Sequence, residues 1–598
     1  MLSETPRAIG VLVFSAALLL TALPAAADHS DPRTPLAPTD GTVAEGTVRG
    51  EGTWEHLANF PGMASEALTG GGTDFEMWRS PLNGNLYGAF GTLGQDELGS
   101  VGQRILLLER KGKVTPRWVA DHGSAHCATE NPSGTLGLQH DSQIARRGKV
   151  RLLTDTTDAT GRCHDPLGGG LEIVDVTKIT KKKFKPREIH LVRLAGFSHT
   201  HTVDAQRPWI VYNSSSDFAG RPWIDVVDLK SCFGALKHKL AKRRNNCRPD
   251  VFRIPFQPEW SQQRDWSTGE LEPGSESACH DITFSGGRLY CAAPNATLIF
   301  DVSGIANAKG KVLGTPFPCE VLDGTNTGAK VTDCNGMGVD RTETALGWEY
   351  LGGFNHPGRD CTPPPTNNTN CNSNNFVRSD DGVAVAHEAD PTADHKYVFV
   401  TDERGGGVVP PGSSCTPGLD NPFGNGGIHA FDISNPAAMD YAMTPEGAKA
   451  VFISDAVVDA PTFCDTHVIE HVPGEQRLIV AYYTQGIKIV DYFITPAGAF
   501  VWRETSSFTL PNANTWVAED FKIVENADGT RTYYLAADDI HRGIDIISFR
   551  HTTNPIGSQP PPGEGGSAAR ADVGLLALGA LLLPAAAWYG RRRRVPTA

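Results

Sequence analysis

The chain has 598 residues, a formal net charge of −14 at pH 7 and 12 cysteines. A chain this acidic lacks the surplus of lysine and arginine that binding to a phosphate backbone requires, so we expect no nucleic-acid partner. The length exceeds what one ordinary core supports, yet no linker divides the region from about residue 50 to 550. We therefore expect a repeated architecture within a single domain.

The first 27 residues have the pattern of a secretory signal peptide. Arg7 precedes an apolar run from Ala8 to Leu23, and the small residues Ala25 to Ala27 follow. This order of charged, apolar and small residues is typical of a cleaved export signal. We predict a signal peptide at 1–27, followed by a flexible N-terminal segment at 28–50.

The C-terminal end has the pattern of a membrane anchor. A spacer rich in Pro, Gly and Ser covers 553–572, an apolar stretch covers 573–590, and a basic tail with four arginines covers 591–598. Eighteen apolar residues are just long enough to cross a bilayer, and the arginines keep the tail in the cytoplasm. We predict an exported domain at the cell surface on a single-pass transmembrane helix. A retained anchor and a processed sorting signal both stay open.

All the cysteines lie in the mature part of the chain, and an exported domain meets an oxidising compartment. Three neighbouring pairs would close short loops: Cys232 with Cys247, Cys319 with Cys334, and Cys361 with Cys371. Spacing alone does not establish the pairing. Because no C-x-x-C motif occurs, a redox dithiol or a zinc ribbon is not expected.

Strand-like runs recur along the chain in a fixed order. Runs that carry an aspartate, such as "GLEIVDVT" at 170, "TLIFDVSG" at 297 and "GIHAFDIS" at 427, each follow a second apolar run and a polar-headed strand further upstream. Most units have a fourth run downstream, and a more degenerate copy begins at "TDFEMW". Repeated four-stranded antiparallel units are typical of a β-propeller. We predict an all-β, seven-bladed β-propeller at 51–552, with six or eight blades as alternatives.

The seventh unit lacks a fourth strand of its own. The segment "TWEHLANF" at 53–60 could supply it by pairing with the last strand, which would join the two ends of the chain. Such closure removes two exposed sheet edges. An ordinary loop is the alternative.

The strands "LEIVDVT", "LIFDVSG" and "IHAFDISNP", with the hairpin His-Asp-Ile-Thr and Gly-Gly-Arg-Leu-Tyr before one of them, resemble the LVIVD-repeat proteins, a family of exported bacterial β-propellers. The resemblance covers most of residues 130 to 550 at the level of short motifs. It implies a propeller in a cell-surface setting and does not imply a particular activity.

Five of the polar strand heads carry a histidine at the matching repeat position. Because the innermost strand of each blade lines the central channel, these side chains should form a ring with Glu519 of the seventh unit and Asp74 or Glu76 of the first. The five histidines are His140, His199, His280, His387 and His467.

Two interpretations of this ring compete. In the first, the neighbouring polar side chains bond to backbone amides and the imidazoles fill the channel as structural groups. In the second, three or four imidazoles bind one transition-metal ion, since neutral imidazole suits Zn, Cu, Fe and Ni. A seven-fold channel is too wide for every blade to reach one ion, so only a subset of the five histidines could bind it.

Other catalytic patterns are missing from the sequence. No G-x-S-x-G motif occurs, and the acidic runs at 154 and 536, which could bind Ca²⁺, lack EF-hand spacing. We therefore predict a binding or scaffolding module, with a protein or cell-envelope ligand on a propeller face and the membrane as its anchor. The alternative is a metal-dependent oxidase or hydrolase with a histidine-bound ion in the channel.

Overall fold

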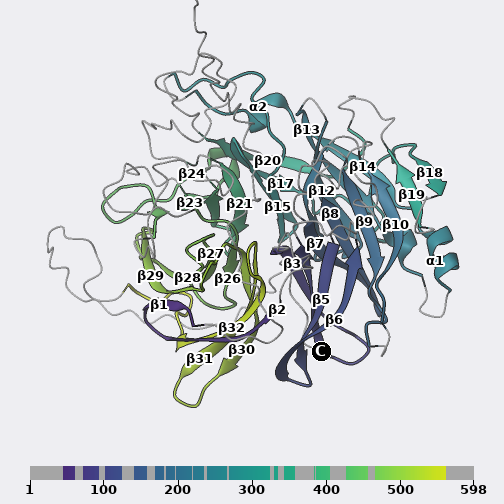
Figure 1. The fold of residues 1–598 in the computed structure, drawn as a ribbon. Coiled ribbons are helices and arrows are strands. Elements are labelled where there is room, and N and C mark those ends of the chain that lie inside the picture. The colour runs from purple at the N-terminus through teal and green to yellow at the C-terminus, as the bar shows by residue number, and fades with distance from the viewer. Residues whose placement is uncertain are drawn as a thin grey trace, which may run out of the picture.

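The fold was obtained as a computed structural model (Figure 1). It describes residues 45–60, 72–92, 102–123, 140–157, 169–180, 184–194, 197–217, 220–234, 239–265, 268–323, 329–334, 343–356, 383, 385–403, 426–454 and 465–560. The predicted signal peptide, transmembrane helix and basic tail lie outside these residues. Within them, no helix is both long enough and apolar enough to span a bilayer.

The described residues form seven sheets, and the strands that belong to one repeat unit pair antiparallel with one another. Blade 1 contains β3 (Gly72–Arg79), β4 (Leu86–Thr92), β5 (Gly102–Arg110) and β6 (Lys113–Gly123), and blade 2 contains β7 (His140–Arg147), β8 (Val150–Thr157), β9 (Gly170–Asp175) and β10 (Arg187–Arg193). Blade 3 contains β11 (Phe197–Val203), β12 (Ile210–Ser216), β13 (Pro222–Asp228) and β14 (Asp250–Pro255), and blade 4 contains β15 (Asp281–Ser285), β16 (Arg288–Ala293), β17 (Ala296–Asp301) and β20 (Glu349–Asn355).

The last three blades are less uniform. Blade 5 contains β21 (Ala386–Pro391), β22 (Tyr397–Asp402) and β23 (Ile428–Asp432), and its outer edge consists of two short strands, β24 (Asp440–Tyr441) and β25 (Val451–Phe452). Blade 6 contains β26 (Ile469–His471), β27 (Arg477–Ala481), β28 (Ile487–Ile494) and β29 (Phe500–Thr509), and blade 7 contains β30 (Thr515–Glu525), β31 (Thr530–Asp539) and β32 (Gly543–Thr552). The described helices are short: η2 (Lys230–Cys232), α1 (Leu240–Asn246), α2 (Pro258–Ser261) and η4 (Pro436–Ala438).

The chain closes through its N-terminal end, as predicted. Strand β2 (Thr53–Phe60) pairs antiparallel with β32 and supplies the fourth strand of blade 7, with Trp54 opposite Phe549. In Figure 1 the purple strands β1 and β2 lie beside yellow-green strands from the end of the chain. The prediction of seven blades joined by this segment is confirmed.

Two other segments add an outer strand to a blade, and the first corrects a sequence-based boundary. Residues 47–50, expected to belong to the flexible N-terminal segment, form β1 (Thr47–Gly50), a fifth strand beside β29 of blade 6. Between β17 and β20 of blade 4 the chain forms β18 (Glu320–Asp323) and β19 (Lys330–Asp333), and β19 runs parallel to β10 of blade 2. In both cases an outer strand exposes unpaired backbone groups, and the added strand satisfies them.

The hydrophobic core lies between neighbouring blades. Tyr212 and Phe252 of blade 3 pack with Phe284 and Phe300 of blade 4 in one buried cluster, and the Tyr212 and Phe284 rings stack at 6.0 Å. Alternating apolar residues on each strand face the next sheet, which explains the period-two pattern in the sequence. These layers hold the inner strands, and therefore the channel, in fixed positions.

Three disulfides occur in the described part of the chain. Cys232–Cys247 and Cys319–Cys334 match pairs that spacing suggested, and Cys279–Cys291 links the start of blade 4 to its second strand. The third suggested pair, Cys361 with Cys371, lies outside the described residues. The tight turn of the same blade uses Gly286 and Gly287, whose φ angles of 60° and 87° match a two-residue hairpin turn.

Candidate metal centre

The inner strands of blades 3 to 6 bring four of the five predicted histidines to one place. His199 and His387 lie in strand irregularities, between Ser198 and His201 on β11 and between Ala386 and Ala389 on β21. A bulge breaks the alternation of side chains and turns one residue toward a new direction. His280 and His467 lie just before the first paired residues of β15 and β26.

The four imidazoles form a continuous row that follows the order of the blades. The ring centroids of His199 and His280 are 4.2 Å apart, those of His280 and His387 4.5 Å, and those of His387 and His467 3.8 Å. The predicted channel set is therefore brought together for these four residues.

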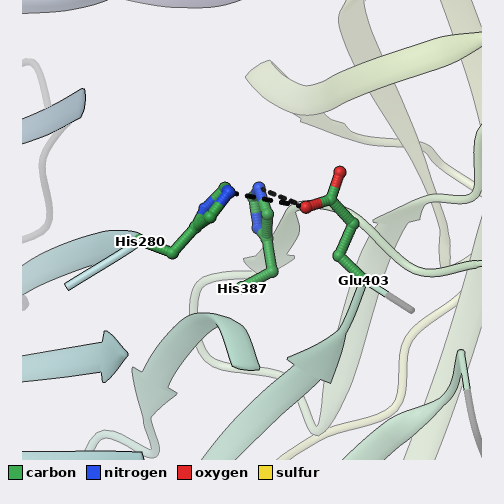
Figure 2. A group of neighbouring side chains, drawn as sticks. All are labelled: His280, His387 and Glu403. Carbon is green, nitrogen blue, oxygen red and sulfur yellow. Dashed lines mark ion pairs between the residues drawn. The ribbon is translucent and has the colours of Figure 1, made fainter. Parts of the chain in front are cut away.

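A carboxylate that the sequence did not single out lies against this row. Glu403 follows β22, and its Oε2 is 3.6 Å from His280 Nε2 and 3.8 Å from His387 Nε2. Its Oε1 is 3.7 Å from His467 Nε2. Figure 2 shows the side chains of His280 and His387 directed at this carboxylate. Three imidazoles thus share one carboxyl group.

Two further groups fix the orientation of the site. The Tyr483 hydroxyl donates a hydrogen bond to Glu403 Oε1. Nδ1 of His467 lies 2.7 Å from the carbonyl oxygen of Trp516, and because a carbonyl can only accept, this nitrogen carries the proton. The lone pair of neutral His467 is therefore on Nε2, the atom that faces Glu403.

Burial controls the protonation of these groups. It raises the pKa of Glu403 to about 7, and the Tyr483 hydrogen bond and the positive charge of His199 offset part of that rise. Burial also lowers the pKa of His467 to about 3, so this imidazole is neutral at pH 7. Burial raises the pKa of Tyr483 well above its ordinary value, which keeps its hydroxyl protonated as the donor to Glu403.

Two buried atoms in the site accept no hydrogen bond from the described residues: Glu403 Oε2 and His467 Nε2. Both side chains are about 1% exposed. Buried polar atoms are normally paired, and leaving one without a partner costs about 1–3 kcal/mol. Both atoms are electron-rich and lie beside the row of imidazoles, so they are candidate ligands for a cation.

The distances fit a metal ion better than they fit direct ion pairs. Ligand atoms about 2.1 Å from one ion in tetrahedral geometry are about 3.4 Å from each other. The distances from Glu403 Oε2 to Nε2 of His280 and of His387, 3.6 and 3.8 Å, are within a few tenths of an ångström of that value. Among the described residues, His280, His387 and Glu403 form the single group of three ligand atoms all within 4.8 Å of one another. Nitrogen and carboxylate donors together suit Zn, Fe, Cu or Ni.

His140, the fifth predicted histidine, has a different environment. Its Nδ1 is 2.8 Å from Asp155 Oδ2 on the neighbouring strand β8, and both side chains are fully buried. No ring contact joins it to the other four histidines in the described structure. Glu519 on β30 and Asp74 and Glu76 on β3 are buried too, and none of them belongs to the three-ligand group.

Sequence reasoning missed Glu403 and Tyr483, although both follow a rule that could have found them. In an antiparallel hairpin the end of the second strand lies beside the start of the first. Glu403 follows the second strand of blade 5, and Tyr483 follows the second strand of blade 6. Polar residues after "YVFVTD" and "RLIVAY" are therefore placed at the same end of the channel as the histidine heads.

Comparison with known proteins adds little to this geometry. No family model and no curated protein matches the chain. Among solved structures, the periplasmic gluconolactonase of Pseudomonas aeruginosa matches with 10% identity and a TM-score of 0.36, over 77% of this chain and 96% of its own. Sqt1 from Chaetomium thermophilum matches with 10% identity and a TM-score of 0.35, over 83% and 86%. Values this low carry no argument about activity, and the propeller assignment rests on the sheet order.

Proposed function

We propose that this propeller binds one transition-metal ion in its channel, held by His280, His387 and Glu403. The observation that carries the proposal is that ligand atoms of these three residues lie within 4.8 Å of one another, and that the buried Glu403 Oε2 has no hydrogen-bond partner among the described residues. A bound cation would satisfy this oxygen and the two imidazoles together.

We further propose that the ion serves a hydrolytic or oxidative reaction rather than only the fold. The His280 side chain is 17% exposed, whereas those of His387, His467 and Glu403 are at most 5% exposed. The group of ligands is therefore closed on one side and reachable at His280. A bound transition metal would supply a Lewis acid for a small molecule entering on that side. In this arrangement Glu403 holds negative charge at the ion, and Tyr483 orients that carboxylate through its hydrogen bond.

Metal analysis of the purified protein tests the first proposal. We expect about one Zn, Fe, Cu or Ni per chain by mass spectrometry of the metal content, and loss of that metal in the double variant His280→Ala and His387→Ala. The control is His551→Ala, which removes an imidazole on β32 of blade 7. If the folded protein takes up none of these metals after dialysis against each of them, the metal proposal fails.

A β-propeller is a general platform for binding partners, and that broader role applies to this fold. We propose in addition that the propeller is exported and displayed on a membrane anchor, with a protein or cell-envelope ligand on one face. The three disulfides support this, because such bonds persist in oxidising compartments. Fractionation of cells that produce the full chain should recover it in membranes, and recovery from the cytosol with reduced cysteines would contradict the proposal. Membership of the LVIVD-repeat family stays a prediction.

A further inference from the structure

A cavity of about 550 Å³ lies at the outer edge of the propeller, between blades 5 and 6. Its walls come from β1 and β29 of blade 6 and from β25 and the residue after it in blade 5. These are outer strands, whereas the metal ligands lie at the inner strands and beside them. The cavity is therefore separate from the channel site.

Two polar side chains of the cavity wall are already engaged within the protein. Glu504 Oε2 accepts a hydrogen bond from Ser454 Oγ at 2.5 Å, and Glu504 Oε1 lies 3.4 Å from Lys488 Nζ. The Ser506 hydroxyl accepts from the Trp54 indole at 2.8 Å and donates to the carbonyl of Arg49 at 3.0 Å. Glu504 and Ser506 therefore already accept hydrogen bonds from the protein itself.

Two hydrogen-bond donors in the same wall have no partner among the described residues. The indole nitrogen of Trp502 is buried and has no hydrogen-bond partner among the described residues. The exposed guanidinium of Arg49 makes no ion pair or hydrogen bond in that part of the chain. Burial lowers the pKa of Lys488, and the charge of Arg49 lowers it further, which places the two cations near each other. The Glu504 carboxylate pairs with Lys488.

The remaining wall is apolar. Val451, Phe452 and Ile453 line it, and the Phe452 ring lies 6.1 Å from the Trp502 ring. A ligand matched to this cavity brings acceptors and negative charge for the two donors and an apolar body for this wall.

We propose that this cavity binds a small organic carboxylate with an apolar body. The carboxylate accepts from Trp502 Nε1–H and pairs with Arg49, and the body packs on Phe452 and its neighbours. This proposal does not depend on the metal centre.

Calorimetric titration of the full-length protein with phenylacetate and with hexanoate tests the proposal. We expect binding that weakens about tenfold in Arg49→Gln and about tenfold in Trp502→Phe, since each change removes one hydrogen bond to a charged group. The neutral alcohol 2-phenylethanol should bind at least about tenfold more weakly than phenylacetate. Arg503→Gln is the matched control: Arg503 alternates to the other face of β29 and pairs with Glu51.

The proposal is overturned if neither acid binds at about 10 mM, a concentration that would detect even millimolar affinity. Equal binding by the parent protein, Arg49→Gln and Trp502→Phe would overturn it as well. Because the metal-site double variant His280→Ala and His387→Ala leaves this cavity intact, it should bind both acids normally. Failure here is therefore distinguishable from failure of the metal proposal.

Discussion

Two groups of buried histidines in this propeller differ in how many carboxylates they have. Around blade 2, three imidazoles each have a carboxylate of their own: His122 is 2.7 Å from Glu172 and His140 is 2.8 Å from Asp155. His201 lies 3.2 Å from Asp141 in the same way. In the channel, His280, His387 and His467 share Glu403.

This difference separates two roles that one residue type can have at similar positions of a repeat. A histidine with its own carboxylate is held by a direct hydrogen bond or ion pair inside the protein. Three imidazoles around one carboxylate cannot each have a carboxylate of their own, and we propose that a cation satisfies the nitrogen and oxygen lone pairs that remain. The number of carboxylates for each imidazole therefore distinguishes the structural histidines from the proposed ligands. The presence of a histidine at the repeat position does not distinguish them.

The largest predicted effect is a loss of stability when a structural histidine loses its carboxylate. Asp155→Ala should lower the free energy of unfolding by about 3 kcal/mol, because it leaves the His140 ring buried without its partner. Denaturant unfolding measures the loss. The metal content should stay unchanged, and Asp155→Asn, which keeps an acceptor for Nδ1–H, should lose less. Loss of the metal from folded Asp155→Ala would show that the two groups are not independent.

A smaller effect concerns a buried histidine that has no carboxylate. Burial lowers the pKa of His190 to about 3, and the ring bonds to the hydroxyl of Thr332 at 2.7 Å. Because the pKa of the folded state lies below the unfolded value of about 6.5, the stabilisation is present above pH 6.5 and is lost as the pH falls. Between pH 7 and pH 5 the free energy of unfolding should fall by about 2 kcal/mol because of His190. His190→Gln should remove this contribution to the pH dependence of stability.

The pH dependence of stability that we expect from His122 has the opposite sign. Burial lowers its pKa, but the Glu172 carboxylate outweighs burial and the net shift is upward. Its stabilisation is therefore complete below about pH 6.5 and is lost as the pH rises through the raised pKa. His122→Gln should flatten the alkaline side of the stability profile and leave the acid side alone. If both variants change the same side, the assignment of their charge states is wrong.

The smallest predicted effect is a change in metal affinity at the proposed channel site. Tyr483→Phe removes the hydroxyl that donates to Glu403 and keeps the ring, so metal affinity should weaken about tenfold with little change in stability. Competition with a chelator measures the affinity. Tyr482→Phe is the matched control, since its hydroxyl bonds to the carbonyl of Gly426 instead. Equal affinities in the parent protein and Tyr483→Phe would remove Tyr483 from the site.

Most of the fold could be predicted because it depends on a local and repeated signal. Alternation of apolar residues locates the strands, and the need to close the ring points to residues 53–60 as the missing strand. The added strands β1 and β19 could not be found in the same way. Their sequences, "TVRG" and "KVTD", are too short to carry a periodic signal, and their pairing depends on exposed edges that exist only in the folded protein.

The candidate site was predictable in part for a similar reason. Repeat position was sufficient to place His199, His280, His387 and His467 together. It did not show that His140 turns to Asp155, because strand alternation and local partners decide the direction of each ring. Glu403 lies after a strand, where sequence alone gives no direction for a side chain.

The pairing of β2 with β32 has a consequence for how the protein is made. His56 and Asp545, which meet in that sheet, are 489 positions apart in the chain. Strand β2 must therefore wait for β32, the last described strand of the chain, before the ring is complete. A loss of residues from either end would open the same blade.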